Sequence, residues 1–363
     1  MSEALLVLAD GTVFHGTAAG APGRADGEVV FNTSMTGYQE MLTDPSYAGQ
    51  LLTLTYPLIG NYGIDPVVEE SGKIQPAGLV VREASRIESH LRSQGPVREY
   101  LEARGVVAIE GVDTRALTRI IRRHGVMPGT ITTDETAGEA LSRLRAMPKY
   151  DDVNWVATVT TDHVYDWNAD ASGSLKRVAL VDGGVKRNIM RSLAARGCAV
   201  RIFPNDVAAE DLLAFRPDGV CLSPGPGDPR LLERMVAETR KLIGKVPILG
   251  ICLGHQVAAQ ALGAGTFKLP FGHRGGNHPV KDLVSGEVTI TAQNHGYAVD
   301  PNGLDAAAYV SHVNLNDQTV EGIALRSEPL MTIQYHSEAC PGPLDNAVIF
   351  DRFVGMMAGG GTR

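Results

Sequence analysis

Long apolar runs are missing from this chain of 363 residues, and their absence argues against a membrane protein. No stretch approaches the roughly eighteen consecutive apolar residues that a membrane-spanning helix requires. The first residues, MSEALLVLADG, contain one short apolar run, an early Glu and no basic segment, so they do not resemble a secretory signal peptide. We therefore expect a cytoplasmic protein.

Cysteine and surplus basic charge are also scarce. The four cysteines are too few and too scattered for a disulfide framework in a chain of this length, which favours a reducing compartment where a free thiolate survives. With 33 basic and 41 acidic residues the net charge is -8, so we expect neither a nucleic acid nor an acidic membrane as a partner. A small-molecule substrate is the simpler expectation.

The usual cofactor motifs are absent as well. The sequence has no G-x-x-x-x-G-K-[ST] phosphate loop, no G-x-G-x-x-G after a predicted strand, no H-E-x-x-H and no paired C-x-x-C. His273 and His278 occur in the stretch FGHRGGNHP, which we interpret as a glycine-rich loop and not as a zinc site. We therefore expect no nucleotide, cofactor or metal on this chain.

Hydrophobic patterning divides the chain in two, as its length of 363 residues also suggests. From 1 to 148, runs such as ALLVLADGTVFHG and GEVVFNTS alternate between apolar and polar residues and are broken by Asp-Gly, Gly and Pro, which predicts a β-rich mixed α/β domain. Within it, Asp113 is the expected N-cap of a helix over 114–124 that ends at Gly125.

A polar, turn-rich stretch over 149–174 is interpreted as a linker, and the pattern changes after it. From 175 to 363, buried strand patterns such as KRVALVD and VPILGI alternate with helical patterns through short loops, which predicts a doubly wound, mostly parallel sheet. Ligands of such sheets bind at the carboxyl ends of the strands. The site is therefore expected in the loops after Asp182, Ser223 and Ile251.

The stretch GICLGHQ, residues 250–256, carries the most specific chemical signal. Gly250-x-Cys252-x-Gly254 has the form of a nucleophile elbow, a sharp strand-to-helix turn that lifts one side chain out of the sheet. A thiol there lies at a helix N-terminus, which favours the thiolate, and the turn directs the backbone N–H of Leu253 at an oxyanion. The other cysteines are better explained as packed side chains: Cys198, Cys221 and Cys340.

A nucleophilic thiol needs a base, and the base needs an orienting group. His255 shares a helix with the thiol, so we expect it to pack or to form a structural hydrogen bond. In QYHSE, His336 and Glu338 follow a predicted strand over 332–335 with period-two spacing, so both point to one side. Glu338 can then hold the imidazole of His336 while the other ring nitrogen faces Cys252.

The loop LSPGPGDP, residues 222–229, is the third expected contributor to the site. Two glycines flank Pro226 and let the backbone approach a ligand closely. Gly225 or Gly227 can therefore donate the second hydrogen bond of an oxyanion hole.

In chain order, SPGPGDP, GICLGHQ, QNHG and H-x-E on an alternating α/β pattern resemble the class I, triad-type glutamine amidotransferases. Within them, GEVVFNTSMTGYQEMLTDPSYAGQLLTLTYPLIGNYG, GVDTRALTR, VKRN and FGHRGGNHPVKD resemble the small, glutamine-hydrolysing subunit of carbamoyl-phosphate synthase. The resemblance runs from about Leu5 to Phe353, and its N-terminal part is not shared with other amidotransferases.

The resemblance implies a reaction and a set of residues. In the family a thiolate attacks the side-chain amide of glutamine, ammonia leaves, and water hydrolyses the resulting thioester. Carried onto this sequence, Cys252 is the nucleophile, His336 the general acid and base and Glu338 its orienter, with the backbones of Gly225 and Leu253 lining the oxyanion hole. Glutamine itself would be held by Ser46, Gly225, Gly227, Leu253, Gln256, Asn294, Gly296 and Tyr297.

Three positions depart from the usual family pattern. Pro224 makes the loop SPGPG where S-N-G-P-G is more frequent, Tyr297 stands where Phe is common, and Ser337 stands where H-P-E-A-S has its proline. None of them removes a reacting group, so they bear on glutamine affinity more than on mechanism.

The resemblance also implies a partner, since carbamoyl phosphate is made from bicarbonate, ammonia and ATP. A large synthetase subunit would bind ATP with a divalent metal and receive ammonia through an internal tunnel, with residues 1–148 as the expected interface. The product feeds arginine and pyrimidine synthesis. Two other readings stay open: a Cys hydrolase of another α/β family, which leaves residues 1–148 unexplained, and a non-catalytic regulatory subunit, which the presence of all three triad residues disfavours.

Overall fold

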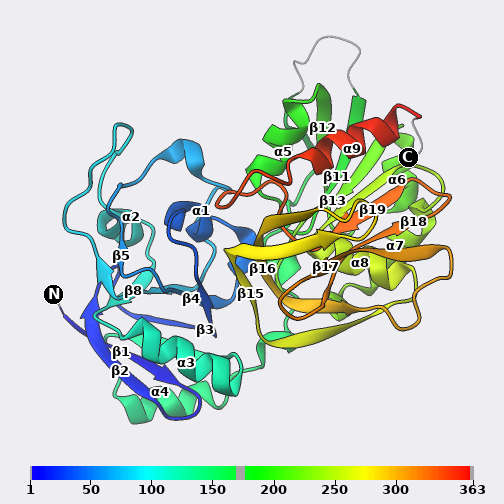
Figure 1. Ribbon diagram of the computed structural model, residues 1–363. Helices are drawn as coiled ribbons and strands as arrows, with labels where there is room; N and C mark the ends of the chain where they lie inside the picture. The colour runs from blue at the N-terminus through cyan, green and yellow to red at the C-terminus, as the bar shows by residue number, and fades with distance from the viewer. Residues whose placement is uncertain (1, 169–175, 360–363) are drawn as a thin grey trace. The chain divides into compact units, whose positions relative to one another are not determined.

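The computed structural model describes residues 2–168 and 176–359 (Figure 1). By internal contacts the chain divides into two compact units, Met1–Val153 and Asn154–Arg363. The described part of the predicted linker contains the 3-10 helices η3 (Tyr150–Asp152) and η4 (Trp155–Thr158) and the strand β10 (Tyr165–Asp166), and its residues 169–174 lie outside the described residues. Among the described helices, none combines the length and apolar character needed to cross a membrane.

The first unit is built mainly from short strands, in line with the alternating patterns of its sequence. Its elements are β1 (Glu3–Leu8), β2 (Val13–Ala18), β3 (Arg24–Asn32), α1 (Tyr38–Leu42), η1 (Pro45–Tyr47), β4 (Gln50–Leu54), β5 (Leu58–Ile59), η2 (Pro66–Val68), β6 (Gly78–Val80), β7 (Glu83–Ala84), α2 (Val97–Ala103), β8 (Val107–Glu110), α3 (Thr114–His124), β9 (Met127–Thr132) and α4 (Ala137–Leu144).

Within residues 2–168, these strands close into a barrel in the order β1-β2-β8-β6-β4-β3-β9. β3 pairs in parallel with β4, β4 with β6 and β6 with β8, and the other pairs are antiparallel. Closure removes the unpaired edges that an open sheet exposes. The sequence predicted the strands but did not indicate the closure.

Both faces of the barrel wall are buried, which explains why all five residues of β4, QLLTL, are buried. On the outer face, Leu52 and Leu79 pack with Tyr38 of α1. On the inner face, a Cβ on Gly78 would approach the Leu51 side chain to 3.0 Å. Side chains therefore fill the barrel, and it is a packed core.

Helix α3 begins and ends as its sequence predicts. The side chain of Asp113 accepts a hydrogen bond from the backbone N–H of Ala116 at 2.9 Å, and Gly125 follows the last turn with φ 87°. Leu117 and Ile121 are fully buried on the inner face of the helix.

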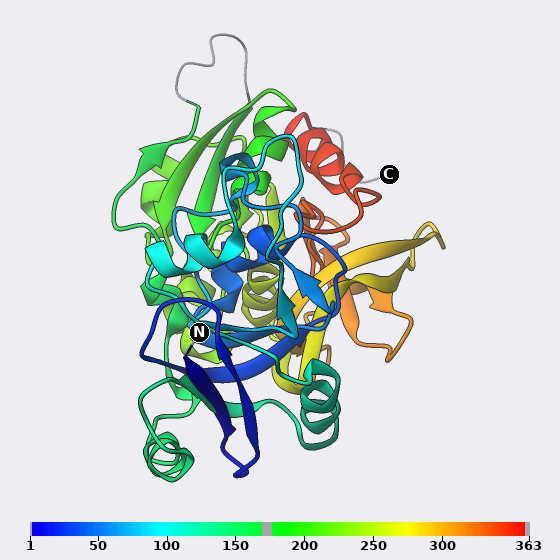
Figure 2. The ribbon, with the colours of Figure 1, turned by 90° about the vertical axis from the view of Figure 1, so that its left-hand side faces the viewer.

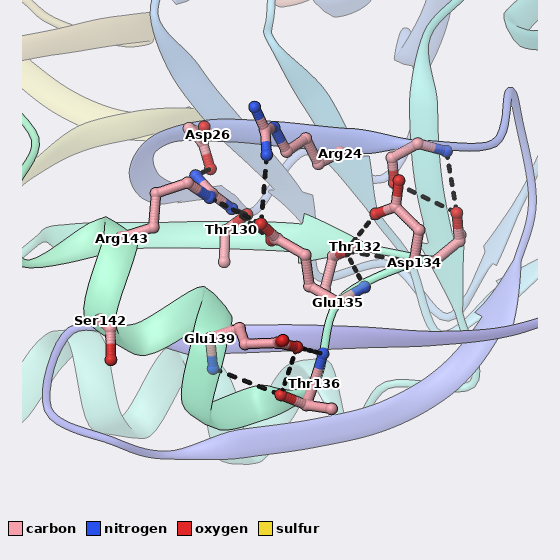
Figure 3. A network of polar contacts seen from close by, with 12 residues as sticks. Arg24, Asp26, Thr130, Thr132, Asp134, Glu135, Thr136, Glu139, Ser142 and Arg143 are labelled. Atoms are coloured by element: carbon pink, nitrogen blue, oxygen red, sulfur yellow. Dashed lines mark hydrogen bonds and ion pairs between the residues drawn. The ribbon is translucent and has the colours of Figure 1, made fainter.

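An arginine on α4 fastens that helix to the barrel wall (Figure 3). Arg143 donates to Asp26 of β3 at 2.6 Å, to Thr130 of β9 at 3.1 Å and to both oxygens of Glu135 at 2.9 and 2.7 Å. The charged side chains of this group remain 17–23% exposed. We call Asp26, Glu135 and Arg143 the Arg143 clamp.

The second unit alternates strands and helices before it ends in long antiparallel strands. After β10 its elements are β11 (Lys176–Asp182), α5 (Arg187–Ala194), β12 (Cys198–Pro204), α6 (Ala209–Ala214), β13 (Gly219–Leu222), η5 (Pro229–Leu231), α7 (Glu233–Leu242), β14 (Ile248–Ile251), α8 (Leu253–Ala261), β15 (Gly265–Asp282), β16 (Val288–Asp300), β17 (Ala308–Asn314), β18 (Val320–Leu325), β19 (Leu330–Ile333) and α9 (Val348–Met357).

These strands form one sheet in the order β10-β12-β11-β13-β14-β19-β18-β16-β15-β17 over the described part of the unit. The neighbours from β12 to β19 run parallel, which confirms the predicted doubly wound arrangement. From β18 onward the pairing is antiparallel. The parallel part brings the carboxyl ends of β11, β13 and β14 to one edge, where the predicted loops follow.

Helices cover both faces of the parallel strands (Figure 1). Ile189 of α5 and Phe353 of α9 belong to the core cluster that contains Leu180 of β11. On the other face, Met235 of α7 packs in a cluster with Val220 of β13, together with α6 and α8. Burial on two faces explains the continuous apolar runs of these strands and leaves only their ends for a site.

The long hairpin of β15 and β16 corrects the interpretation of FGHRGGNHP as a loop (Figure 2). These residues lie in β15, where His273 pairs with His295 and His278 with Thr291 across the two strands. The register shifts between Gly275 and His278, so the glycines mark a bulge. The glycines suggested a loop. The pairing with β16 that makes this segment a strand cannot be seen in the sequence of the segment itself.

Candidate active site

The predicted nucleophile elbow lies at the junction of β14 and α8. Cys252 is the N-cap of α8 with φ 53° and ψ -103°, a conformation that non-glycine residues rarely adopt. A Cβ on Gly250 would come within 2.7 Å of the Gly254 carbonyl oxygen, and one on Gly254 within 2.2 Å of the Leu222 carbonyl oxygen. Both glycines are therefore required by close backbone contacts, as the motif implies.

His336 and Glu338 form a buried pair next to this sulfur. Nδ1 of His336 lies 2.6 Å from Oε1 of Glu338, while Nε2 is buried without a hydrogen-bond partner among the described residues. Burial alone would lower the pKa of His336, but the carboxylate of Glu338 and the sulfur of Cys252 raise it to about 10. The geometry therefore favours an imidazolium whose Nε2 is available to the sulfur.

The strand before His336 and Glu338 ends two residues earlier than predicted. β19 ends at Ile333, whereas the expected strand ran over 332–335, and His336 lies in the loop beyond it. The backbone N–H of His336 donates to the carbonyl of Ala292 at 2.9 Å, which fixes the loop on β16, two strands away in the sheet. The two side chains therefore meet through a loop and not through period-two alternation in a strand.

Lys186 is a member of the site that sequence reasoning missed. Its Nζ lies 3.1 Å from Oε1 of Glu338 and also donates to the carbonyl of Ala339, and the Lys186 and Glu338 side chains are 2% and 0% exposed. Burial would raise the pKa of Glu338, but the charges of Lys186 and His336 lower it to about 2. Lys186 follows Asp182 in one of the three expected loops, and that position is the signal that could have found it.

The two predicted oxyanion donors lie beside each other at the elbow. A Cβ on Gly225 would meet the side chain of Leu253 at 2.6 Å and the carbonyl oxygen of Gly183 at 2.1 Å. Leu253 is the first residue of α8, so its N–H is not needed by the hydrogen bonds of the helix. The Ser223 hydroxyl fixes this loop, since it accepts from the Gly183 N–H at 2.8 Å and donates to the Pro224 carbonyl at 2.9 Å.

Several predicted glutamine-binding residues lie in the same region as the thiol, on α8 and β16. The backbone carbonyl of Asn294 faces the sulfur of Cys252 at 3.7 Å, and that of Tyr297 accepts a hydrogen bond from Gln256 at 2.9 Å. Gly296 lies between Asn294 and Tyr297 on β16. The structure thus brings Gln256, Asn294, Gly296 and Tyr297 together with Cys252.

For two further residues predicted to bind glutamine, Gly227 and Ser46, the structure shows no contact with Cys252 among the described residues. Gly227, in the same loop as Gly225, has φ 88°, and a Cβ there would meet Trp155 at 3.4 Å. Ser46 belongs to the first unit, where its N–H donates to Asp44 at 2.9 Å and its hydroxyl is buried without a partner among the described residues. Its part in glutamine binding stays a prediction.

His255 has the environment of a structural histidine. It is fully buried, and its Nδ1 lies 2.8 Å from the hydroxyl of Thr332. Burial lowers the pKa of His255 to about 3, so the ring is neutral. A neutral, hydrogen-bonded ring agrees with the packing role expected for this residue.

A buried polar cluster on β15, β16 and β18 is the one place in the described chain where metal ligands gather. His273, His295 and Glu321 each place one potential ligand atom within 4.8 Å of the others. The Glu321 oxygens already accept hydrogen bonds from Gln293 at 2.9 Å and Asn314 at 2.8 Å, and burial raises the pKa of Glu321 to about 7. These bonds engage both oxygens of the carboxylate, and the absence of a metal stays a prediction.

Comparison with known proteins covers both units. Residues 6–131 match the family described as carbamoyl-phosphate synthase small chain, CPSase domain, and residues 179–356 match glutamine amidotransferase class-I. The carbamoyl phosphate synthase small chain of Akkermansia muciniphila is 48% identical over 363 residues, covering 98% of each chain. That of Listeria monocytogenes is 49% identical over 366 residues, covering 99% of this chain and 98% of that one.

Proposed function

This chain belongs to the carbamoyl-phosphate synthase small-chain family, and we propose that it hydrolyses glutamine at Cys252 to deliver ammonia to a large synthetase subunit. The observation that carries the proposal is the buried group of a thiol on an elbow, an imidazole with an unused Nε2 and a carboxylate 2.6 Å from Nδ1. These are the nucleophile, the acid and base, and the orienting group that acyl transfer through a thioester needs.

In the first half of the proposed reaction, the thiolate of Cys252 attacks the side-chain amide carbon of glutamine. The new C–S bond moves an electron pair onto the amide oxygen, where the N–H groups of Leu253 and Gly225 donate hydrogen bonds to it. The C–N bond then breaks, and the nitrogen takes a proton from Nε2 of His336 and leaves as ammonia. A glutamyl thioester and a neutral imidazole remain.

In the second half, His336 acts as a base. Its Nε2 takes a proton from water, and the hydroxide attacks the thioester carbon. The C–S bond breaks, which releases glutamate and returns the thiolate of Cys252 and the imidazolium of His336. The same oxyanion donors serve both halves.

Glu338 and Lys186 have positioning roles in this scheme. Glu338 accepts from Nδ1 of His336, which fixes the tautomer and turns Nε2 toward the sulfur. Lys186 keeps that buried carboxylate ionised, because its ammonium lies 3.1 Å away. Without Lys186, the buried carboxylate of Glu338 would have His336 as its one remaining positive neighbour among the described residues.

The proposed glutamine site of the second unit consists of Gln256, Asn294, Gly296 and Tyr297 with Gly225, Gly227 and Leu253. The part of Ser46 in glutamine binding stays a prediction from the family resemblance. All three family departures are buried, and two of them carry polar groups: Tyr297 is 4% exposed and Ser337 1% exposed. Both change polar groups near the substrate without touching the reacting atoms. We therefore expect them to affect the KM for glutamine more than kcat.

We further propose that a large subunit binds ATP and its divalent metal and that the first unit contributes the interface. Four apolar side chains of that unit, on loops and on η2, are exposed to solvent and are candidates for such a contact. Met35, Val67, Ile87 and Leu91 are 70%, 65%, 79% and 98% exposed.

The first experiment measures glutamate release from glutamine by the purified chain, with and without a large synthetase subunit, bicarbonate and ATP. We expect the partner to stimulate release strongly. No release under either condition would overturn the catalytic proposal and favour a non-catalytic regulatory subunit.

Cys252→Ser then separates chemistry from structure. The complex with this variant is expected to lose glutamine-dependent carbamoyl phosphate synthesis and to keep synthesis from added ammonia. Loss of both activities would assign Cys252 to folding or assembly.

A further inference from the structure

A side chain outside the expected triad contacts the reacting sulfur. Gln334 follows β19 and is fully buried, and its backbone N–H donates to the carbonyl of Glu321 at 2.8 Å. The preceding residue, Ile333, accepts a hydrogen bond from the backbone N–H of Cys252 at 2.8 Å. The side-chain Nε2 of Gln334 lies 3.6 Å from Sγ of Cys252. The backbone thus fixes Gln334 at the nucleophile.

The orientation of the Gln334 amide follows from its neighbours. The backbone carbonyl of Tyr297 can only accept hydrogen bonds, so the group of Gln256 that lies 2.9 Å from it must be the NH2 group. The same NH2 group lies 3.0 Å from Gln334, which must therefore present its oxygen to it. The NH2 group of Gln334 is left facing the sulfur.

His295 strengthens the fixed end of this chain of hydrogen bonds. Its Nδ1 lies 2.7 Å from the same Tyr297 carbonyl, so in the tautomer with the hydrogen on Nδ1 that oxygen accepts from both His295 and Gln256. Rotating the Gln256 amide would set its oxygen against two acceptors, the carbonyl of Tyr297 and the oxygen of Gln334. The alternative orientation is therefore excluded by repulsion.

Two polar groups beside the sulfur, apart from His336, favour different protonation states. The Asn294 carbonyl, 3.7 Å away, can accept the hydrogen of a thiol but has nothing to donate to a thiolate. The Gln334 NH2 group can only donate, and a hydrogen bond to an anion is stronger than one to a neutral acceptor. Gln334 is thus matched to the charged form of Cys252.

We infer that Gln334 is a catalytic residue, which stabilises the Cys252 thiolate by a hydrogen bond that Gln256 orients. The inference deepens the proposed function and rests on it. The same bond serves when the thioester is hydrolysed, because the departing sulfur again carries a negative charge. His336 offers a positive charge to the sulfur, whereas Gln334 offers a donor that neither gains nor loses a proton in the reaction.

The test follows alkylation of Cys252 by iodoacetamide across pH, with the modified peptide quantified by mass spectrometry. Gln334→Leu removes the donor, and Gln334→Glu puts a carboxylate in its place. We expect the pH midpoint of alkylation to rise by about one unit in Gln334→Leu, the size expected for a hydrogen bond to a charged group, and further in Gln334→Glu. The kcat for glutamine is expected to fall roughly tenfold in Gln334→Leu, with a smaller change in KM.

Gln260→Leu is the matched control. Gln260 lies on α8 as Gln256 does, but its amide donates to Thr266 at 3.1 Å, away from the sulfur. This variant is expected to keep the wild-type alkylation midpoint. Circular dichroism and thermal melting establish that each variant is folded, and Gln334→Met, close in length and volume, takes the place of Gln334→Leu if the latter does not fold.

An unchanged midpoint in folded Gln334→Leu or Gln334→Met would overturn the inference and leave Gln334 as a packing residue. The alkylation profile does not depend on glutamine turnover. If the wild-type protein failed to hydrolyse glutamine, the proposed function would fall, while the alkylation midpoints would still decide whether Gln334 acts on the sulfur.

Discussion

The Arg143 clamp of the first unit and the group formed by Lys186, Glu338 and His336 in the second have similar chemistry in different surroundings. In each, one strong cation lies 2.6–3.1 Å from a carboxylate oxygen. The clamp side chains are 17–23% exposed, whereas Lys186 and Glu338 are 2% and 0% exposed. Solvent can screen and replace the first contacts but not the second.

Burial therefore changes what each group does for the molecule. A water-exposed ion pair contributes little, since water solvates either partner when the other is removed. A buried pair leaves an uncompensated charge when it is broken. The clamp fastens a helix to a barrel, while the buried group keeps the Glu338 carboxylate ionised against the His336 ring.

The largest expected effect tests whether the buried group is catalytic. His336→Asn removes the acid and base and is expected to lower kcat for glutamine by roughly 1,000-fold or more. Glu338→Gln keeps the imidazole and removes only its orienting charge, so its loss should be clearly smaller. Steady-state glutamate release by the complex measures both. Equal losses would mean that Glu338 does more than orient the ring.

The next effect concerns stability. Lys186→Met is expected to lower the free energy of unfolding by about 3–5 kcal/mol, because Glu338 is then buried with one cation fewer. Urea unfolding followed by circular dichroism measures it. The double variant Lys186→Met/Glu338→Gln should recover part of the loss, since the unpaired charge is gone. No recovery would assign the effect of Lys186 to packing.

A pH series sharpens the comparison further. The pKa of His336 is raised from its usual value to about 10, so the pair stabilises the fold fully below about pH 6.5 and loses this contribution as pH rises through about 10. The difference in unfolding free energy between wild type and His336→Asn is therefore expected to shrink from pH 6.5 to 10. A difference that stayed constant would contradict a charged His336.

The smallest expected effect is that of Arg143→Met. Because the clamp is partly exposed, its removal should cost about 1 kcal/mol or less and leave the kcat for glutamine unchanged. The same urea and glutaminase measurements apply. A loss as large as that of Lys186→Met would erase the distinction between the two groups.

Local patterns were enough to predict much of the second unit. The alternation of strands and helices gave a parallel sheet, and the spacing Gly250-x-Cys252-x-Gly254 gave the elbow, because both depend on residues close in sequence. His336 and Glu338 could be proposed as partners since they are two residues apart. Their roles stay proposals, although the structure brings them together with Cys252.

The missed features depend on contacts between distant parts of the chain. Nothing in the local sequence distinguishes Lys186 from a surface lysine, and only the fold places it against Glu338. Gln334 likewise has the sequence pattern of a strand residue, and only the fold places its side chain at Cys252. The barrel closure and the bulged strand around Gly275 likewise require knowledge of the partner strand. Sequence periodicity predicts which face of an element a side chain lies on, but it does not predict which distant residues that side chain contacts.

The backbone at Cys252 has a consequence for attempts to make this enzyme more robust. A cysteine with φ 53° carries strain of roughly 1–3 kcal/mol, which a glycine at that position would not. Cys252→Gly is therefore expected to melt at a higher temperature than the wild type while losing its nucleophile. A mutant library screened only for heat resistance would enrich inactive proteins, so selection must include turnover from the first round.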